Sequence, residues 1–173
     1  MNTKQAFVVG ASGMVGKQLV ETLSANPRFS RIVLFGRRDI DLPNPPKHLE
    51  QRKIDFENLS EHKKDFEGFD VGFCALGTSS RLHPDLFVKV DHDYVVNTAK
   101  MAKECGTDTF CLVTAASTDE KSRFEYPRIK AAAERDVLAL GFNRTIITRP
   151  PMIIGEREVA TVPYKIITLW HSP

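Results

Sequence analysis

Cysteine is scarce in this sequence, and no long apolar run occurs. The three cysteines, Cys74, Cys105 and Cys111, are an odd number without a CxxC pair, which excludes a disulfide framework and a zinc-binding spacing. No stretch of about 18 apolar residues could span a membrane, and the chain enters a short apolar segment at 6–9 without a leader peptide before it. We therefore expect a cytoplasmic protein with neither a bound metal nor a membrane partner.

An excess of either charge sign is also lacking. The chain has 24 basic and 22 acidic side chains, and a net charge of +2 gives no general reason to expect a nucleic-acid partner. Hydrophobic residues make up 42% and charged residues 27%, which is ordinary for a globular protein. The length of 173 residues favours one domain, 1–173, with a short substrate-side tail from about residue 156. In that tail, residues 162–170 suit a helix or a strand equally.

What the sequence does contain is a regular alternation of strand-like and helix-like segments. Apolar runs predict strands at 6–9, 31–35, 70–76, 109–114 and 144–148, with a weaker strand centred on 52–56. Apolar residues at helical spacing predict helices at 14–24, 59–66, 84–104 and 127–140. Repeated β-α-β units place helices on both faces of a parallel sheet. The predicted fold class is α/β, a doubly wound parallel sheet in three layers (αβα).

Three glycines, at positions 10, 13 and 16, stand between the first strand and the first helix. Without side chains, the backbone can turn tightly there and approach a pyrophosphate, while the helix N-terminus offers N–H groups and a positive dipole end. The alternative is a strand–helix turn whose glycines serve only packing. The turn predicts a dinucleotide site with contacts from Gly10, Ser12, Gly13, Met14, Val15 and Gly16.

Two arginines, Arg37 and Arg38, follow Gly36 at the end of the second strand. An acidic residue at this place binds the ribose 2′-hydroxyl of NAD and repels a 2′-phosphate. Guanidinium groups instead bind a phosphate through charge-assisted, bidentate hydrogen bonds. Because Asp39 and Asp41 come only after the strand has ended, the sequence favours NADP(H). The alternative is that one or both arginines are solvated surface charge.

A tyrosine and a lysine four residues apart, Tyr126 and Lys130, open the helix after the fifth strand. At this spacing both side chains lie on one helix face. A phenol exchanges a proton with a carbonyl or an alcohol more readily when a nearby ammonium group favours the phenolate. The alternative is a tyrosine and a lysine on the solvent face of an amphipathic helix. The position of the pair in the chain favours the catalytic interpretation.

Taken together, these features resemble the short-chain dehydrogenase/reductase superfamily in its atypical branch, and more narrowly the Tat-interacting-protein group. The segments that carry the resemblance are VVGASGMVG, VLFGRR, DVGFCALGTSS, VDHDYV and YPRIK, which span residues 6 to about 155. The resemblance implies an NAD(P)-binding Rossmann fold, with NADPH at 10–16 and at Arg37 and Arg38. It also implies a reaction centre at Tyr126 and Lys130, with Lys130 bonded to the nicotinamide ribose.

The resemblance extends to further contacts with substrate and cofactor. It gives Thr114, at the end of the fifth strand, the hydroxyl that orients the substrate oxygen; Ser117 is the second candidate. It places Pro150, in the arginine–proline turn after the sixth strand, beside the nicotinamide. Asp55 either meets the adenine amino group or only caps a turn, and both interpretations stay open. The remaining expected cofactor contacts are Phe56, Leu76, Gly77 and Thr78.

Two departures from the superfamily affect the substrate side. Thr114 stands where a serine is usual, and the chain ends soon after the sixth strand, where members of the group continue. We therefore expect either a truncated form or a short member with an open substrate site.

Two functions fit this sequence. The first is an NADPH-dependent oxidoreductase that acts on an unidentified carbonyl or alcohol substrate. The second is an NADPH-binding regulatory or sensor protein that binds a protein partner without turnover. The intact tyrosine–lysine pair favours the enzyme, and a structural subunit without ligand is a weaker third interpretation. A homodimer also stays open, because exposed helix faces in such sheets often pair.

Overall fold

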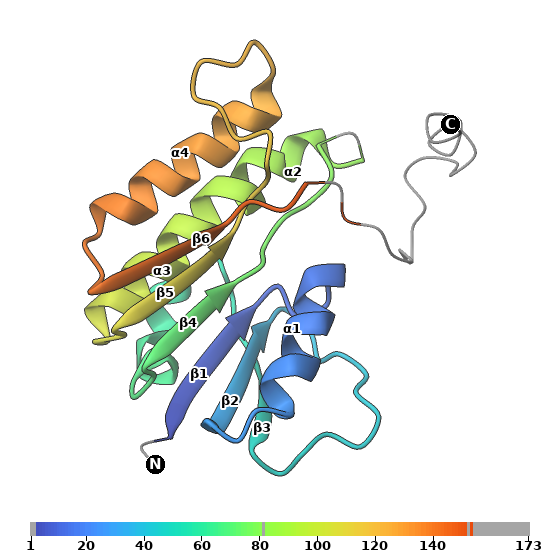
Figure 1. The fold of residues 1–173 in the computed structure, drawn as a ribbon, viewed down its shortest axis with the longest axis vertical. Helices are drawn as coiled ribbons and strands as arrows, with labels where there is room; N and C mark the ends of the chain where they lie inside the picture. Colours follow the sequence, from blue (N-terminus) through green and yellow to red (C-terminus); the bar gives the residue numbers. More distant parts are fainter. Residues whose placement is uncertain (1–2, 81, 152, 154–173) are drawn as a thin grey trace, which may run out of the picture.

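The computed structural model describes residues 3–80, 82–151 and 153, which form a parallel sheet with helices on both faces (Figure 1). The strands are β1 (Lys4–Val9), β2 (Phe29–Gly36), β3 (Leu49–Lys53), β4 (Val71–Cys74), β5 (Thr109–Val113) and β6 (Arg144–Thr148). Their order is β3-β2-β1-β4-β5-β6, and every pair is parallel. The predicted doubly wound sheet is confirmed. The chain direction across the sheet reverses between β1 and β4, where open α/β sheets form a crevice.

The helices divide between the two faces of the sheet (Figure 1). One face carries α1 (Met14–Ser24), and the other carries the 3-10 helix η1 (Leu59–Phe66), α3 (Tyr94–Glu104) and α4 (Glu125–Ala139). A short helix α2 (Pro84–Val88) and a π-helical turn η2 (Lys89–Asp93) lead directly into α3. No helix within the described ranges is long and apolar enough to cross a membrane. The predicted tail from about 156, including 162–170, lies outside the described residues.

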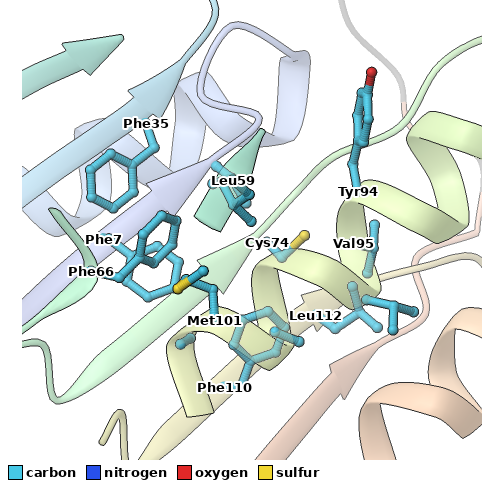
Figure 2. Packing of buried hydrophobic residues seen from close by; sticks show 14 of the residues in the cluster. Phe7, Phe35, Leu59, Phe66, Cys74, Tyr94, Val95, Met101, Phe110 and Leu112 are labelled. Atoms are coloured by element: carbon cyan, nitrogen blue, oxygen red, sulfur yellow. The ribbon is translucent and has the colours of Figure 1, made fainter. Parts of the chain in front are cut away.

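The larger core cluster lies between the sheet and the helices η1, α3 and α4 (Figure 2). Phe7 of β1 packs edge-on against two rings there, with centroid distances of 5.2 Å to Phe66 and 5.5 Å to Phe69. Gly72 of β4 makes room for Phe7, because a Cβ at Gly72 would come within 2.4 Å of the ring. Burying one phenylalanine side chain contributes roughly 2–3 kcal/mol. A smaller cluster packs the opposite face of β1 and β2 against α1, so β1 is apolar on both sides.

Two predicted elements differ from the structure. Strand β3 spans Leu49–Lys53 instead of centring on 52–56, because Asp55 already caps a turn by accepting the N–H of Glu57 at 2.9 Å. This edge strand is rich in charged residues and has no apolar alternation to mark it. The helix predicted over 84–104 is interrupted at η2, where the backbone takes π-helical hydrogen bonding for one turn. Helical periodicity in the sequence does not reveal one inserted residue.

Candidate functional site

A cleft of about 650 Å³ opens at the carboxyl ends of β1, β2 and β4, at the reversal point of the sheet. Its volume lies in the range of small-molecule sites, about 300–1,000 Å³. Several residues predicted to contact a cofactor come together along its walls. These are Gly10, Ser12, Gly13, Arg37, Arg38, Phe56, Leu76, Gly77 and Thr78.

The three glycines of the turn after β1 have different structural reasons. Gly10 has a positive φ of 82°, and a Cβ there would lie 2.5 Å from the carbonyl carbon of Ala75. A Cβ on Gly16 would lie 2.0 Å from the Gly10 oxygen, so this glycine lets α1 pack against the turn. A Cβ on Gly13 would meet nothing closer than 3.5 Å. Packing therefore explains two of the glycines, whereas Gly13 leaves open space in the wall of the cleft.

Helix α1 begins directly at this turn. Gly13 is its N-cap, no side chain caps the helix, and its first turn contains no acidic residue. The first turn consists of Met14, Val15 and Gly16, and none of these three residues belongs to the described lining of the cleft. An uncapped helix N-terminus of this kind attracts an anion through its N–H groups and its dipole. The backbone of these residues thus fits a phosphate of a dinucleotide.

Arg37 and Arg38 follow the end of β2 and are both exposed at the cleft. Neither arginine takes part in an ion pair within residues 3–80, 82–151 and 153. The carboxylate of Asp39, by contrast, is 3.0 Å from the ammonium of Lys53. Gly36 presents no side chain at the strand end. The edge of the cleft after β2 therefore carries two arginines, and Asp39, the one acidic residue in the described lining of the cleft, is paired with a lysine.

Asp55 and Phe56 lie after β3 and have different surroundings. Both carboxylate oxygens of Asp55 accept hydrogen bonds inside one turn, from the Glu57 N–H at 2.9 Å and the Asn58 amide at 2.8 Å. These two bonds lower the pKa of the exposed Asp55 carboxyl. The structure thus shows Asp55 as a turn cap, and its contact with the adenine amino group stays a prediction. Phe56 lines the cleft, and its ring is stacked 5.1 Å from that of Tyr94.

Tyr126 and Lys130 occupy the first turns of α4, as predicted. The half-buried Tyr126 ring is stacked on Phe87 of α2 with a centroid distance of 5.6 Å. The Lys130 Nζ lies 5.9 Å from the centroid of the same tyrosine ring. Lys130 is buried and forms an ion pair with Asp91 of η2, with 2.7 Å between Nζ and Oδ1. In the described part of the chain, the Tyr126 hydroxyl has no hydrogen-bond partner.

Thr114 is buried at the end of β5, and its hydroxyl donates a 2.6 Å hydrogen bond to Glu134 of α4. Arg149, after β6, donates to the same carboxylate through two nitrogens. Burial alone would raise the pKa of Glu134, but the hydrogen bonds from Arg149 and Thr114 outweigh it and hold the pKa below its ordinary value. The one hydrogen of the Thr114 hydroxyl is therefore donated to an ionised carboxylate. Ser117, the second candidate, is exposed.

Pro150 connects the loops that follow β5 and β6. Its carbonyl accepts the N–H of Ala116 at 2.9 Å. Among the described residues, Pro150, Thr114, Tyr126 and Lys130 do not belong to the lining of the cleft. The structure thus brings nine of the cofactor candidates together in the cleft. Four others, Met14, Val15, Gly16 and Asp55, lie outside its described lining, and the reaction-centre candidates lie beside it, on α4 and the two strand ends.

Two side chains of this region were not predicted from the sequence, namely Asp91 and Glu134. Both are buried acidic residues. Glu134 lies at helical spacing from a predicted residue, and Asp91 lies at helical spacing from a residue that packs against a predicted one. Glu134 follows Lys130 by one helical turn, and Asp91 follows Phe87 by one turn. That spacing was the available signal, but acidic residues on helices are usually exposed.

Comparison with protein families and known proteins agrees with this geometry. A model of the NAD(P)H-binding family matches residues 10–167. Protein HTATIP2 of Rattus norvegicus is 38% identical over 160 residues, covering 91% of this chain and 66% of that protein. Protein FMP52, mitochondrial, of Saccharomyces cerevisiae is 34% identical over 153 residues, covering 87% of this chain and 66% of that protein. The chain thus spans about two thirds of the length of these relatives.

Solved structures share the fold at low sequence identity. A UDP-glucuronic acid 4-epimerase from Bacillus cereus, in complex with NAD, has a TM-score of 0.69 and 16% identity over 89% of this chain and 58% of its own. A short-chain dehydrogenase/reductase superfamily protein from Agrobacterium tumefaciens, with bound NAD, has a TM-score of 0.65 and 16% identity over 84% of this chain and 48% of its own. The chain therefore belongs to the NAD(P)H-binding family and has the Rossmann fold of short-chain dehydrogenases and reductases.

Proposed function

We propose that this protein is an NADPH-dependent oxidoreductase of the short-chain dehydrogenase type that acts on a carbonyl or alcohol substrate. The charge at the end of β2 is the observation that supports NADPH over NADH. Arg37 and Arg38 are exposed at the cleft without ion-pair partners in the described ranges, and Asp39, the one acidic residue of the described lining, is paired with Lys53. A 2′-phosphate placed there would gain two guanidinium partners and meet no free carboxylate.

The other walls of the cleft would hold the rest of the dinucleotide. The uncapped start of α1 would receive the pyrophosphate, with Gly13 leaving room for close approach. Phe56 would pack beside the adenine, and Gly77 and Thr78 would line the nicotinamide half. When bound, a nicotinamide dinucleotide supplies or accepts a hydride.

In the proposed reaction Tyr126 exchanges a proton with the substrate oxygen. Its hydroxyl has no partner in the described part of the chain, and Phe87 fixes the plane of its ring. The Lys130 Nζ lies 5.9 Å from the centroid of that ring, so its positive charge stands beside the reacting group. A hydroxyl has one hydrogen to donate. While the Thr114 hydroxyl donates its hydrogen bond to Glu134, it orients the substrate only as a hydrogen-bond acceptor. A donor role for Thr114 requires its hydroxyl to turn away from Glu134.

A second candidate function is an NADPH-binding sensor without turnover. The observation that favours it is that Lys130 and Thr114 are already satisfied, by Asp91 and by Glu134. In a sensor these groups would only stabilise the fold beside the cofactor. The free Tyr126 hydroxyl favours the enzyme.

The test is a titration of the purified chain with NADPH and with NADH, followed by nicotinamide fluorescence. Tight binding of NADPH with weak binding of NADH is expected, and equal affinities would overturn the proposed preference. A second assay measures NADPH consumption with a panel of aldehydes, ketones and quinones. Consumption supports the oxidoreductase, whereas tight binding with no consumption across the panel favours the sensor.

We also propose a cytoplasmic location. Fungal relatives such as FMP52 of Saccharomyces cerevisiae are named mitochondrial, so cell fractionation with an antibody against this chain is the direct test. Size-exclusion chromatography with light scattering decides between a monomer and the homodimer that the sequence left open.

A further inference from the structure

Asp91 and Lys130 form a buried ion pair directly behind the cleft. The side chains are 1% and 6% exposed, and the Lys130 Nζ is 2.7 Å from Asp91 Oδ1. Asp91 belongs to the π-helical turn η2 and Lys130 to α4, so the pair joins two helices on the same face of the sheet. A charge this deeply buried is costly unless its partner is held in place.

The same carboxylate also fixes the backbone of the cleft. Its other oxygen, Oδ2, accepts the N–H of Thr78 at 2.7 Å. A Cβ on the neighbouring Gly77 would lie 3.3 Å from Asp91 Oδ1 and 3.5 Å from Lys130 Nζ. Gly77 and Thr78 both line the cleft. The ion pair is thus separated from the cleft only by the backbone of the loop after β4.

A gain in stability is a weak explanation of this arrangement. Asp91 Oδ1 has no aligned hydrogen-bond donor in the described part of the chain, although the ammonium group is close. Burial raises the pKa of Asp91 in spite of Lys130 and the Thr78 N–H. Buried ion pairs can often be replaced by apolar residues without loss of stability. A role in placing Lys130 explains why a carboxylate stands here.

The turn that carries Asp91 is held against α4 at a second point. His92 Nε2 lies 2.9 Å from Asp136 Oδ2 of α4, and His92 Nδ1 lies 2.8 Å from Asp93. The turn η2 and the helix α4 are therefore joined at two points, by Asp91 with Lys130 and by His92 with Asp136. π-Helical turns within α-helices are frequent at functional sites.

We propose that Asp91 is a positioning residue that holds the Lys130 ammonium between the Tyr126 ring and the loop of Gly77 and Thr78, where Lys130 acts on the cofactor. This inference rests on the proposed function and on the bond from Lys130 to the nicotinamide ribose that the resemblance to short-chain dehydrogenases implies. It assigns Asp91 two separable contacts, one with Lys130 and one with the Thr78 backbone. Lys130 and Asp91 then act as one unit toward NADPH.

The experiment is a double-mutant cycle on NADPH affinity, measured by nicotinamide fluorescence. The variants are Asp91→Asn, Lys130→Met and the double variant. Asp91→Asn keeps an oxygen for the Thr78 N–H and removes the charge that faces Lys130. We expect each single variant to raise the Kd for NADPH about tenfold, and the double variant to be no weaker than either single one. The matched control is Asp93→Asn on the same turn, which is half-exposed and contacts His92; its Kd stays near that of the wild type.

Three results separate this inference from the proposed function. An unchanged Kd for Asp91→Asn, or a Kd for the double variant equal to the product of both single effects, overturns the role of Asp91. If Asp91→Asn does not fold because Lys130 is left as an unpaired buried charge, the double variant, which removes both charges, is expected to fold again. A wild type that binds no NADPH overturns the proposed function. In that case, urea unfolding of the wild type, the two single variants and the double variant tests the pairing of Asp91 with Lys130. If the two substitutions change the free energy of unfolding independently, the pairing is overturned.

Discussion

The hydroxyl of Thr114 donates a 2.6 Å hydrogen bond to Glu134, and this bond joins the end of β5 to α4. Arg149, after β6, binds the same carboxylate. Glu134 lies one helical turn beyond Lys130 and two turns beyond Tyr126. One buried carboxylate thus holds together the two strand ends and the helix that carry the proposed reaction centre.

Replacing Glu134 by Gln is expected to lower the free energy of unfolding by about 2 kcal/mol at neutral pH, because hydrogen bonds to a charged group are lost. The pKa of Glu134 in the fold lies below its ordinary value of 4.5, so its contribution is present above that pH and is lost as the pH falls through the lowered pKa. The wild type and the variant should therefore converge in stability on acidification. Urea unfolding at several pH values measures this difference.

Glu120→Gln is the matched control for that substitution. Glu120 also pairs with an arginine, Arg135, but its side chain is 62% exposed. An exposed pair contributes little, so the control should change the free energy of unfolding by less than about 0.5 kcal/mol. If Glu120→Gln lowered the free energy of unfolding as much as Glu134→Gln, burial would not explain the contribution of Glu134.

Gly13→Ala and Gly16→Ala should separate cofactor binding from folding. At Gly13 the backbone φ of −76° accepts alanine and a Cβ meets nothing within 3.5 Å, so the variant should fold normally and lose NADPH affinity. At Gly16 a Cβ would come within 2.0 Å of a carbonyl oxygen, which should destabilise the protein by roughly 2 kcal/mol or more. Thermal unfolding and NADPH titration of both variants check this. Undiminished NADPH affinity in Gly13→Ala would contradict the assigned site.

The double variant Arg37→Ala with Arg38→Ala should weaken NADPH about 100-fold and NADH by less than about threefold, because only NADPH carries the 2′-phosphate that the guanidinium groups bind. Fluorescence titration with both cofactors gives the two ratios. Arg28→Ala, an exposed arginine outside the described lining of the cleft, serves as the control. Equal losses of affinity for NADPH and NADH would mean that the arginines bind the pyrophosphate, or that they act only through the overall positive potential of the cleft.

Tyr126→Phe should reduce turnover at least about 100-fold while NADPH affinity stays within about twofold of the wild type. The phenylalanine ring keeps the stacking on Phe87 and loses only the hydroxyl, which has no partner in the described residues. Turnover is measured as NADPH consumption with a substrate found in the carbonyl panel, and affinity by fluorescence. Full activity of the variant would remove Tyr126 from the proposed mechanism.

Much of the cofactor half of the site could be predicted because its signals are local. The glycines of the first turn and Arg37 and Arg38 each stand directly after an apolar run that is recognisable as a buried strand. Parallel strands then bring their carboxyl ends to one edge of the sheet, where the cleft lies. The third strand was misplaced because β3 is a charged edge strand without apolar alternation.

Local patterns in the chain suffice for the strand–helix alternation, for the order of elements and for part of the lining of the cleft, since each of these depends on neighbouring residues. Packing in three dimensions sets the remaining contacts: Lys130 pairs with Asp91, the Thr114 hydroxyl donates its hydrogen bond to Glu134, and Asp91 of the π-helical turn is buried. These contacts depend on how α3, α4 and the strands pack. An acidic residue on a helix carries no mark of whether it faces water or a buried ammonium group, because the choice is made by the helix that packs against it.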